Sequence, residues 1–120
     1  MKNRDFVIDY VKNMPGAIYD MPFENDFDTT VLRHTGSRKW FGIIMSVKRS
    51  KVGMPGEGEV DVLNLKSNPE DSIILFELYD RIIPAYHMNK THWISVILDG
   101  SLPYDLVLKL IDKSFYITKK

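Results

Sequence analysis

The stretch RKWFGIIMSVKRSKVGMPGEGEVDVLNLK, residues 38–66, decides the fold. Apolar residues recur along its two arms, 38–51 and 59–66, whereas the connection at 52–58 carries three glycines and a proline. Glycine and proline together favour a turn, and apolar alternation on either side favours paired strands. The stretch therefore predicts a long antiparallel hairpin, and the remainder of the chain is expected to pack against it.

A single register of this hairpin accommodates both its apolar residues and its charges. When residues whose numbers sum to 110 are paired, apolar side chains face each other and opposite charges face each other, which stabilises both kinds of cross-strand neighbour. The predicted pairs are Met45 with Leu65, Val47 with Leu63, Arg49 with Asp61, and Lys51 with Glu59.

The segments around the hairpin alternate between helix and strand. Apolar residues spaced by three and four predict helices, and alternation predicts strands. Pro15-Gly16 ends the first helix, and Pro84 ends the second. The predicted elements are a helix at 4–14, an irregular acidic segment at 17–28, a strand at 29–35, a helix at 68–83, a strand at 91–99 and a helix at 101–117.

This order predicts an α+β fold, a two-layer α/β sandwich whose mostly antiparallel sheet carries the helices on one face. The period of two along each strand assigns the side chains to faces. The face toward the helices is predicted to hold Phe41, Ile43, Met45, Val47, Leu63 and Leu65. The opposite face is predicted to hold Trp40, Ser46, Lys48, Asn64, Lys66, Trp93 and Ser95.

Length and composition limit the class of protein. A chain of 120 residues fits one domain, 1–120, and one core. Sixteen basic and sixteen acidic residues give a net charge of zero, which argues against long-range attraction to nucleic acid. Because there is no cysteine, disulfides and thiol chemistry are excluded. No apolar run has the length of a membrane span and no signal-peptide core is present, so we expect a monomer in the cytoplasm.

The charges are nevertheless unevenly distributed. Between Thr29 and Gly56 there is no acidic residue, and the basic residues there are Arg33, Arg38, Lys39, Lys48, Arg49 and Lys51. Such a patch is compatible with nucleic-acid binding. The alternative is a solvated hairpin whose charges are cancelled by Asp61 and Glu59 in the predicted register.

The sequence offers little support for a metal or a catalytic centre. His87 and His92 lie five residues apart, and no carboxylate is close to them in sequence. An acidic N-terminal region that includes Asp5 and Asp9 could bind a divalent cation, although a solvated acidic surface is the commoner use of such residues. No glycine-flanked serine, phosphate loop or paired carboxylates occur. We therefore expect neither an enzyme nor a cofactor, and no metal ligand is assigned.

The stretch PAYHMNKTHWISVIL, residues 84–98, places a polar turn directly before a strand. Lys90 lies in this turn and is expected to expose its ammonium, so that its loss barely changes stability. His92 shares its strand parity with Ile94 and Val96, so its ring is expected to face the helices.

Five segments resemble the MmcQ/YjbR family in order and spacing: MPGAIYDMPF, VLRHTGSRKWFGII, VLNLKSNPE, PAYHMNKTHWISV and LIDKSFYIT. The resemblance runs from about Phe6 to Thr118, and YHMNKTHW is its most specific part. It implies the fold of CyaY, the bacterial frataxin, and the DNA-binding "double wing" role usually given to the family. Positions that depart from the common family residues include Arg38, Ser67, Ala85 and Thr91.

Together, the patch and the resemblance predict a small binding module that contacts DNA with a basic, tryptophan-bearing sheet face. The residues predicted to bind nucleic acid are Arg38, Lys39, Trp40, Lys48, Lys66, Asn89, Lys90 and Trp93. The alternative is a frataxin-like domain that binds a metal or a protein partner with its acidic N-terminal region.

Overall fold

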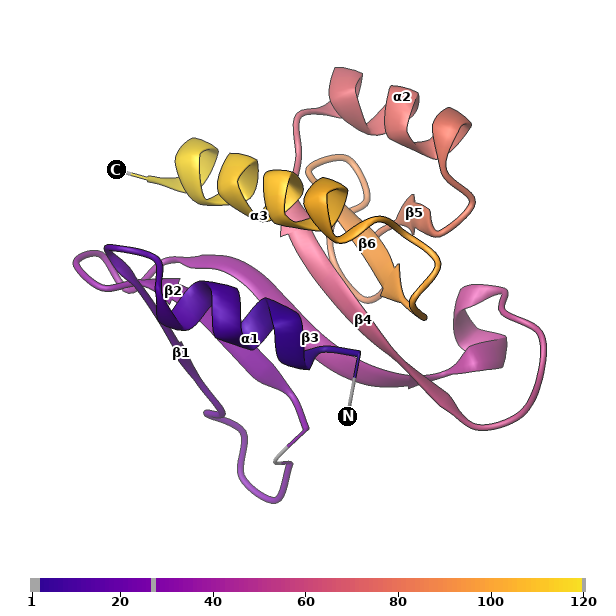
Figure 1. The fold of residues 1–120 in the computed structure, drawn as a ribbon, viewed down its shortest axis with the longest axis horizontal. Helices are drawn as coiled ribbons and strands as arrows, with labels where there is room; N and C mark the ends of the chain where they lie inside the picture. Colours follow the sequence, from indigo (N-terminus) through magenta and orange to yellow (C-terminus); the bar gives the residue numbers. More distant parts are fainter. Residues whose placement is uncertain (1–2, 27, 120) are drawn as a thin grey trace.

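A computed structural model describes residues 3–26 and 28–119 of the chain. Its six strands form one antiparallel sheet in the order β1-β2-β3-β4-β6-β5, so the predicted α+β fold with an antiparallel sheet is confirmed. The elements, drawn in Figure 1, are α1 (Asp5–Lys12), β1 (Ala17–Asp20), β2 (Thr30–His34), β3 (Trp40–Lys48), the 3₁₀ helix η1 (Arg49–Val52), β4 (Glu59–Lys66), α2 (Pro69–Leu78), β5 (Ile82–Pro84), β6 (Trp93–Leu98) and α3 (Tyr104–Thr118).

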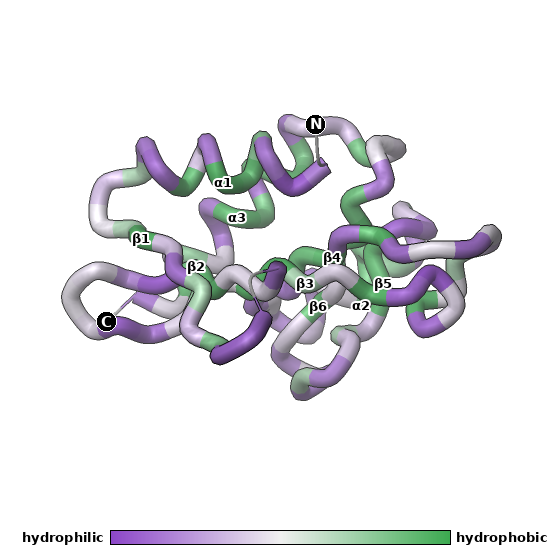
Figure 2. The backbone as a smooth tube through the Cα atoms, turned by 90° about the horizontal axis from the view of Figure 1, so that it is seen from below, coloured by the Kyte–Doolittle hydropathy of each residue, from purple (hydrophilic) through white to green (hydrophobic). Residues whose placement is uncertain are grey.

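The main core lies between the sheet and the helices. Figure 2 shows α1 and α3 on the same side of the sheet. Val7 and Val11 of α1 and Ile111 of α3 are fully buried there against the central strands. The remaining helix, α2, lies beside the edge strand β5, and its partly buried Leu75 packs against the same cluster. All three helices therefore contribute apolar side chains to a single core.

The hairpin of β3 and β4 forms, but the predicted register is wrong. The observed partners sum to 107, so Ile44 lies opposite Leu63 and Lys48 lies opposite Glu59. The reason is that Arg49 begins a 3₁₀ turn instead of continuing the strand. The N–H of Arg49 donates to the Gly58 carbonyl and closes a longer connection. The predicted pairs of Arg49 with Asp61 and Lys51 with Glu59 do not form, so the charges of this hairpin do not cancel in the predicted way.

A register shift by an odd number of residues exchanges the two faces of a strand. Ile43, Met45 and Val47, predicted to face the helices, therefore lie on the opposite face. Met45 and Val47 pack there with Val52 and Met54 of the long connection. Because these residues form a second core cluster, that face is not the open surface that the sequence predicted.

Phe41 keeps its predicted place in the main core because of a bulge. Leu32 lies opposite Gly42, whereas Arg33 lies opposite Trp40, so β3 has one extra residue at Phe41. An extra residue reverses the alternation at that point. Phe41 consequently faces the helices, and its neighbour Trp40 faces the other way beside Arg33.

The two edge strands were not predicted from the sequence. Ala17–Asp20 pairs with β2, although the segment 17–28 was predicted to be irregular. The second helix ends at Leu78 instead of extending to residue 83, and Ile82–Pro84 forms β5. Proline cannot donate to a strand ladder, but it is tolerated in an edge strand, which is where Pro84 lies.

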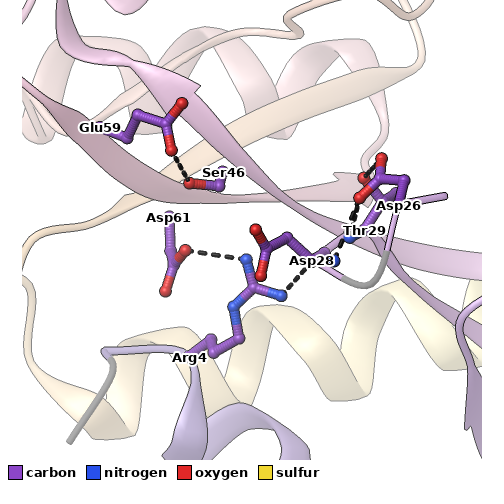
Figure 3. A network of polar contacts seen from close by, with 7 residues as sticks. All are labelled: Arg4, Asp26, Asp28, Thr29, Ser46, Glu59 and Asp61. Atoms are coloured by element: carbon purple, nitrogen blue, oxygen red, sulfur yellow. Dashed lines mark hydrogen bonds and ion pairs between the residues drawn. The ribbon is translucent and has the colours of Figure 1, made fainter.

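Arg4 ties the first helix to the sheet. Its guanidinium donates to a carboxylate oxygen of Asp61 on β4 at 2.8 Å and to the backbone carbonyl of Asp28 (Figure 3). The Arg4 side chain is only 6% exposed and that of Asp61 is 13% exposed. The start of α1, the middle of the sheet and the loop before β2 therefore meet at one buried charge.

We expect Asp61→Ala to lower the free energy of unfolding by about 3 kcal/mol, because it removes the carboxylate with which the buried Arg4 guanidinium forms an ion pair on β4. Urea denaturation measures this change. Asp71→Ala is the matched control, since its ion pair with Lys113 is between a third and a half exposed and should contribute less than about 1 kcal/mol. Equal losses in the two variants would show that Arg4 does not anchor the helix.

Candidate nucleic-acid interface

Three neighbouring strands bring predicted site residues together at one end of the sheet. Trp40 begins β3, Lys66 ends β4 and Trp93 begins β6, and these strands are adjacent in the order β3-β4-β6. Lys66 and Trp93 are direct cross-strand partners. A cleft of about 350 Å³ lies at this end of the sheet. It is lined by Lys39, Trp40, Lys66, Trp93, Ile117 and Thr118. We call it the tryptophan cleft.

Each indole of the tryptophan cleft has a cation over its ring. The Lys66 ammonium lies 5.5 Å from the ring centroid of Trp93, and the Arg33 guanidinium lies 5.5 Å from that of Trp40. The ring quadrupole attracts a cation at such a distance. Arg33 is held in turn by Asp20, whose carboxylate oxygen lies 3.0 Å from the Arg33 Nε. Both indoles are thus partly buried and fixed by neighbours before any ligand arrives.

The tryptophan cleft carries an unbalanced positive charge. None of its lining residues is acidic. Within residues 3–26 and 28–119, Lys39 and Lys66 form no ion pair, whereas Lys113 is paired with Asp71. Two lysines are therefore available to an anionic group without first breaking an ion pair.

Ser114 of α3 sets the shape of the sheet at this end. Its hydroxyl donates to the Phe41 carbonyl at 2.5 Å and accepts the Lys66 N–H at 2.9 Å. Continuing the register of β3 and β4 would place Phe41 directly opposite Lys66. The serine hydroxyl instead stands between the two strands, and α3 reaches the tryptophan cleft with its last turn.

His34 of β2 supports the same helix end. Its ring packs against Phe41 and Phe115, and its Nε2 lies 2.7 Å from the hydroxyl of Thr118, which lines the tryptophan cleft. Burial lowers the pKa of His34, and the charges of Lys119 and Lys39 lower it further. The imidazole is therefore held in its neutral form at neutral pH.

Buried polar side chains fasten the turn at 85–92 to the sheet. Asn64 Nδ2 donates to the Tyr86 carbonyl at 2.9 Å, and the Tyr86 N–H donates to the Ser95 hydroxyl at 2.8 Å. The Ser95 hydroxyl donates to Asn64 Oδ1 at 2.5 Å and closes the network. Both backbone groups of Tyr86 are thereby satisfied by side chains that are fully buried.

Within the turn, two predicted binding residues serve its structure. Asn89 Oδ1 accepts the N–H groups of Thr91 and His92, at 2.9 and 3.1 Å. Lys90 is exposed, as predicted, but its ammonium donates to the Ala85 carbonyl at 2.8 Å. His92 is exposed, so the prediction that its ring faces the helices is wrong.

The eight predicted binding residues therefore fall into three groups. Lys39, Trp40, Lys66 and Trp93 line one cleft, and Arg38 is exposed in the adjoining turn with a φ of 67°. Asn89 and Lys90 make internal hydrogen bonds of the neighbouring turn.

Lys48 lies at the far end of β3, roughly 26 Å from Trp40 at the usual rise per strand residue. Lys48 lies on the same face of β3 as Ile44, whereas the bulge at Phe41 places Trp40 on the other face. The prediction that Lys48 shares a face with the tryptophans is wrong.

Sequence reasoning did not assign Ile117, Thr118 and Arg33 to this site. The lining by α3 depends on packing between distant segments, which no local pattern reveals. The cation over Trp40 depends on the bulge at Phe41, which turns Trp40 toward Arg33.

In the acidic N-terminal region, the Asp26 carboxylate forms hydrogen bonds within its own loop. The Asp26 carboxylate accepts the N–H groups of Asp28 and Thr29 and the Thr29 hydroxyl, and the last of these bonds is the largest cause that lowers the Asp26 pKa. Residues 3–26 and 28–119 contain no group of three histidine or acidic residues placed to hold a metal ion.

In the same residues no helix is long and apolar enough to span a membrane.

The fold defines a small α+β domain with one antiparallel sheet, and solved structures and sequence relatives of the same kind are known. The YjbR family model matches residues 12–117, and the chain belongs to the YjbR family. It is 42% identical over 119 residues to protein YyaQ of Bacillus subtilis, and the match covers 99% of this chain and 100% of that protein. It is 40% identical over 53 residues to protein YjbR of Escherichia coli, covering 44% of this chain and 45% of the relative.

Solved structures are similar as well. A crystal structure of a Pseudomonas syringae protein has a TM-score of 0.90 at 39% identity, over 97% of this chain and 98% of that one. A Deinococcus radiodurans protein with a DUF419 domain has a TM-score of 0.75 at 27% identity, over 100% of this chain and 81% of that one. The resemblance noted in the sequence is confirmed at the level of the family.

The lowered pKa of His34 predicts that stability falls in mild acid. The folded pKa lies below the unfolded one, so the contribution is complete above about pH 6.5 and is lost as the pH falls toward the folded pKa. Thermal or urea unfolding between pH 7 and 5 should show this loss in the native chain. His34→Gln should flatten the curve. An unchanged slope in His34→Gln would refute the assignment.

We expect Asn89→Ala to lower the free energy of unfolding by about 1–2 kcal/mol, since two backbone N–H groups lose their acceptor. Asn68→Ala is the matched control, because Asn68 precedes α2 without a side-chain capping bond and should change stability by less than about 0.5 kcal/mol. Denaturant titration of both variants gives the comparison. Equal stabilities would show that Asn89 does not hold the turn.

Proposed function

We propose that this protein is a small nucleic-acid-binding module, with DNA as the partner, and that it binds through the tryptophan cleft. The observation that carries the proposal is the lining of one cleft by two indoles and two lysines with no acidic residue. Nucleic acid presents phosphates, which cations attract, and bases, which stack on aromatic rings. Both complementary features occur here within a few ångströms of each other.

The net charge of zero is consistent with such a role when the cations are concentrated. Lys39, Lys66 and the exposed Arg38 lie at one end of the sheet. Lys119 is also at this end, because its charge and that of Lys39 both act on His34. A few phosphate contacts then supply a modest electrostatic attraction, and ring stacking supplies the remaining affinity.

The frataxin-like alternative is not supported. Asp26 of the acidic region is engaged in hydrogen bonds with its own loop, and no cluster of metal-binding side chains occurs within residues 3–26 and 28–119. The likeness to CyaY, the "double wing" description, the cytoplasmic location and the monomeric state stay predictions. We propose binding without catalysis.

Replacing Lys39 and Lys66 together by Ala should weaken binding of a labelled DNA, measured by fluorescence anisotropy across a salt series. The slope of log affinity against log salt should decrease by about 0.7 to 0.9 for each lysine that contacts a phosphate. Lys48→Ala with Lys51→Ala is the matched control, because it removes the same charge from the far end of the hairpin. An equal effect of both double variants would place the contacts outside the tryptophan cleft, and no binding at low salt would refute the proposed function.

A further inference from the structure

The lining of the tryptophan cleft, with an aromatic residue on each of two strands, suits a flat ring. Trp40 and Trp93 start strands that are separated by one strand, β4. At the regular strand spacing of about 4.8 Å the two tryptophan backbones would be roughly 10 Å apart, and the Ser114 hydroxyl, which stands between β3 and β4 at this end, separates them further. A ring stacked between two others needs about 7–8 Å, twice the optimal carbon–carbon contact distance.

We propose that the tryptophan cleft binds one unpaired base of a single-stranded nucleic acid between Trp40 and Trp93, with the adjoining phosphates at Lys39 and Lys66. The inference rests on the proposed function and names its substrate class. It predicts that the protein prefers single strands to duplexes.

A duplex does not fit this site. In a duplex each base face is covered by its neighbours, so an indole can stack only on a base that has left the stack. The tryptophan cleft is a recess of about 350 Å³, within the usual range for small-ligand sites. The lining residues thus suit a base that enters the protein.

The number of available cations leads to the same preference. A duplex binder that neutralises many phosphates depends on a large basic surface. Here Arg33 is paired with Asp20, and the Lys90 ammonium is bonded to the Ala85 carbonyl. Only a few cations remain at this end of the sheet, whereas one stacked base contributes about 1–3 kcal/mol.

The indoles are held in place before binding, which lowers the cost in side-chain conformational entropy when a ligand binds. The Arg33 guanidinium lies 5.5 Å from the Trp40 ring centroid, and the Phe23 ring makes an edge contact with the same indole at 6.4 Å between centroids. Trp93 has the Lys66 ammonium over its ring. This lysine is within reach of both the ring and a phosphate next to a stacked base.

The test titrates the protein with four probes: a labelled oligothymidine, a hairpin duplex of equal length, an abasic strand with the same phosphates, and thymidine monophosphate. Anisotropy and intrinsic tryptophan fluorescence are recorded together. We expect the oligothymidine to bind at least about tenfold more tightly than the duplex or the abasic strand, and to quench the tryptophan emission. Thymidine monophosphate should bind more weakly, because it lacks the neighbouring phosphates.

Variants then assign the stacking to residues. Trp93→Ala should weaken oligothymidine binding by about 5- to 150-fold, the equivalent of one stacked base, while Trp93→Phe should retain most of it. Circular dichroism checks the folding of each variant. The abasic comparison uses the unmodified chain, so the proposal stays testable even if Trp93→Ala does not fold.

The contradicting outcomes are distinct. Duplex or abasic binding as tight as that of oligothymidine would overturn the inference and leave the proposed function standing. Thymidine monophosphate binding as tight as the strand would also overturn it, in favour of a nucleotide site. Failure of every nucleic acid to bind would refute both proposals.

Discussion

The hydroxyl of Ser114 is the contact on which the geometry of the candidate site depends. It satisfies the Phe41 carbonyl and the Lys66 N–H, two backbone groups that lie opposite each other when the β3–β4 register is extended. A buried backbone group without a partner costs free energy, so a helix that inserts between two strands must supply both a donor and an acceptor. Serine does so with one atom. Because Ser114 is completely buried, the last turn of α3 is held at the mouth of the tryptophan cleft.

The bulge at Phe41 and the Ser114 hydroxyl both affect the start of β3, at Trp40 and Phe41. The bulge turns Phe41 into the main core, where its ring meets His34 and Phe115, and turns Trp40 to the other face. With regular alternation, a strand that has Ile44 in the core would also turn Trp40 toward the core and Phe41 away from it; the bulge exchanges the two aromatic residues. The irregularity is therefore what allows one strand to serve both the core and the cleft.

Much of the fold could be predicted from the sequence, because it follows from local patterns. Alternation and turn residues correctly predicted the hairpin of β3 and β4, the strand β6, and the location of Lys66 and Trp93 on one face of the sheet. The register could not be predicted, since pairing opposite charges ignored the 3₁₀ turn that buries Val52. That turn is favoured by contacts with Val60 and Val62 across the second face, which are tertiary and leave no periodic signal.

The site was predictable in its residue types but not in its boundaries. Tryptophan and lysine on strand ends suggested a binding face, yet the lysines at the two ends of β3 look alike in sequence. Only the packing distinguishes Lys39, beside two indoles, from Lys48, opposite Glu59. The same holds for the turn at 85–92, where Asn89 resembles a ligand-binding residue until its carbonyl oxygen is found to accept two backbone N–H groups of its own turn.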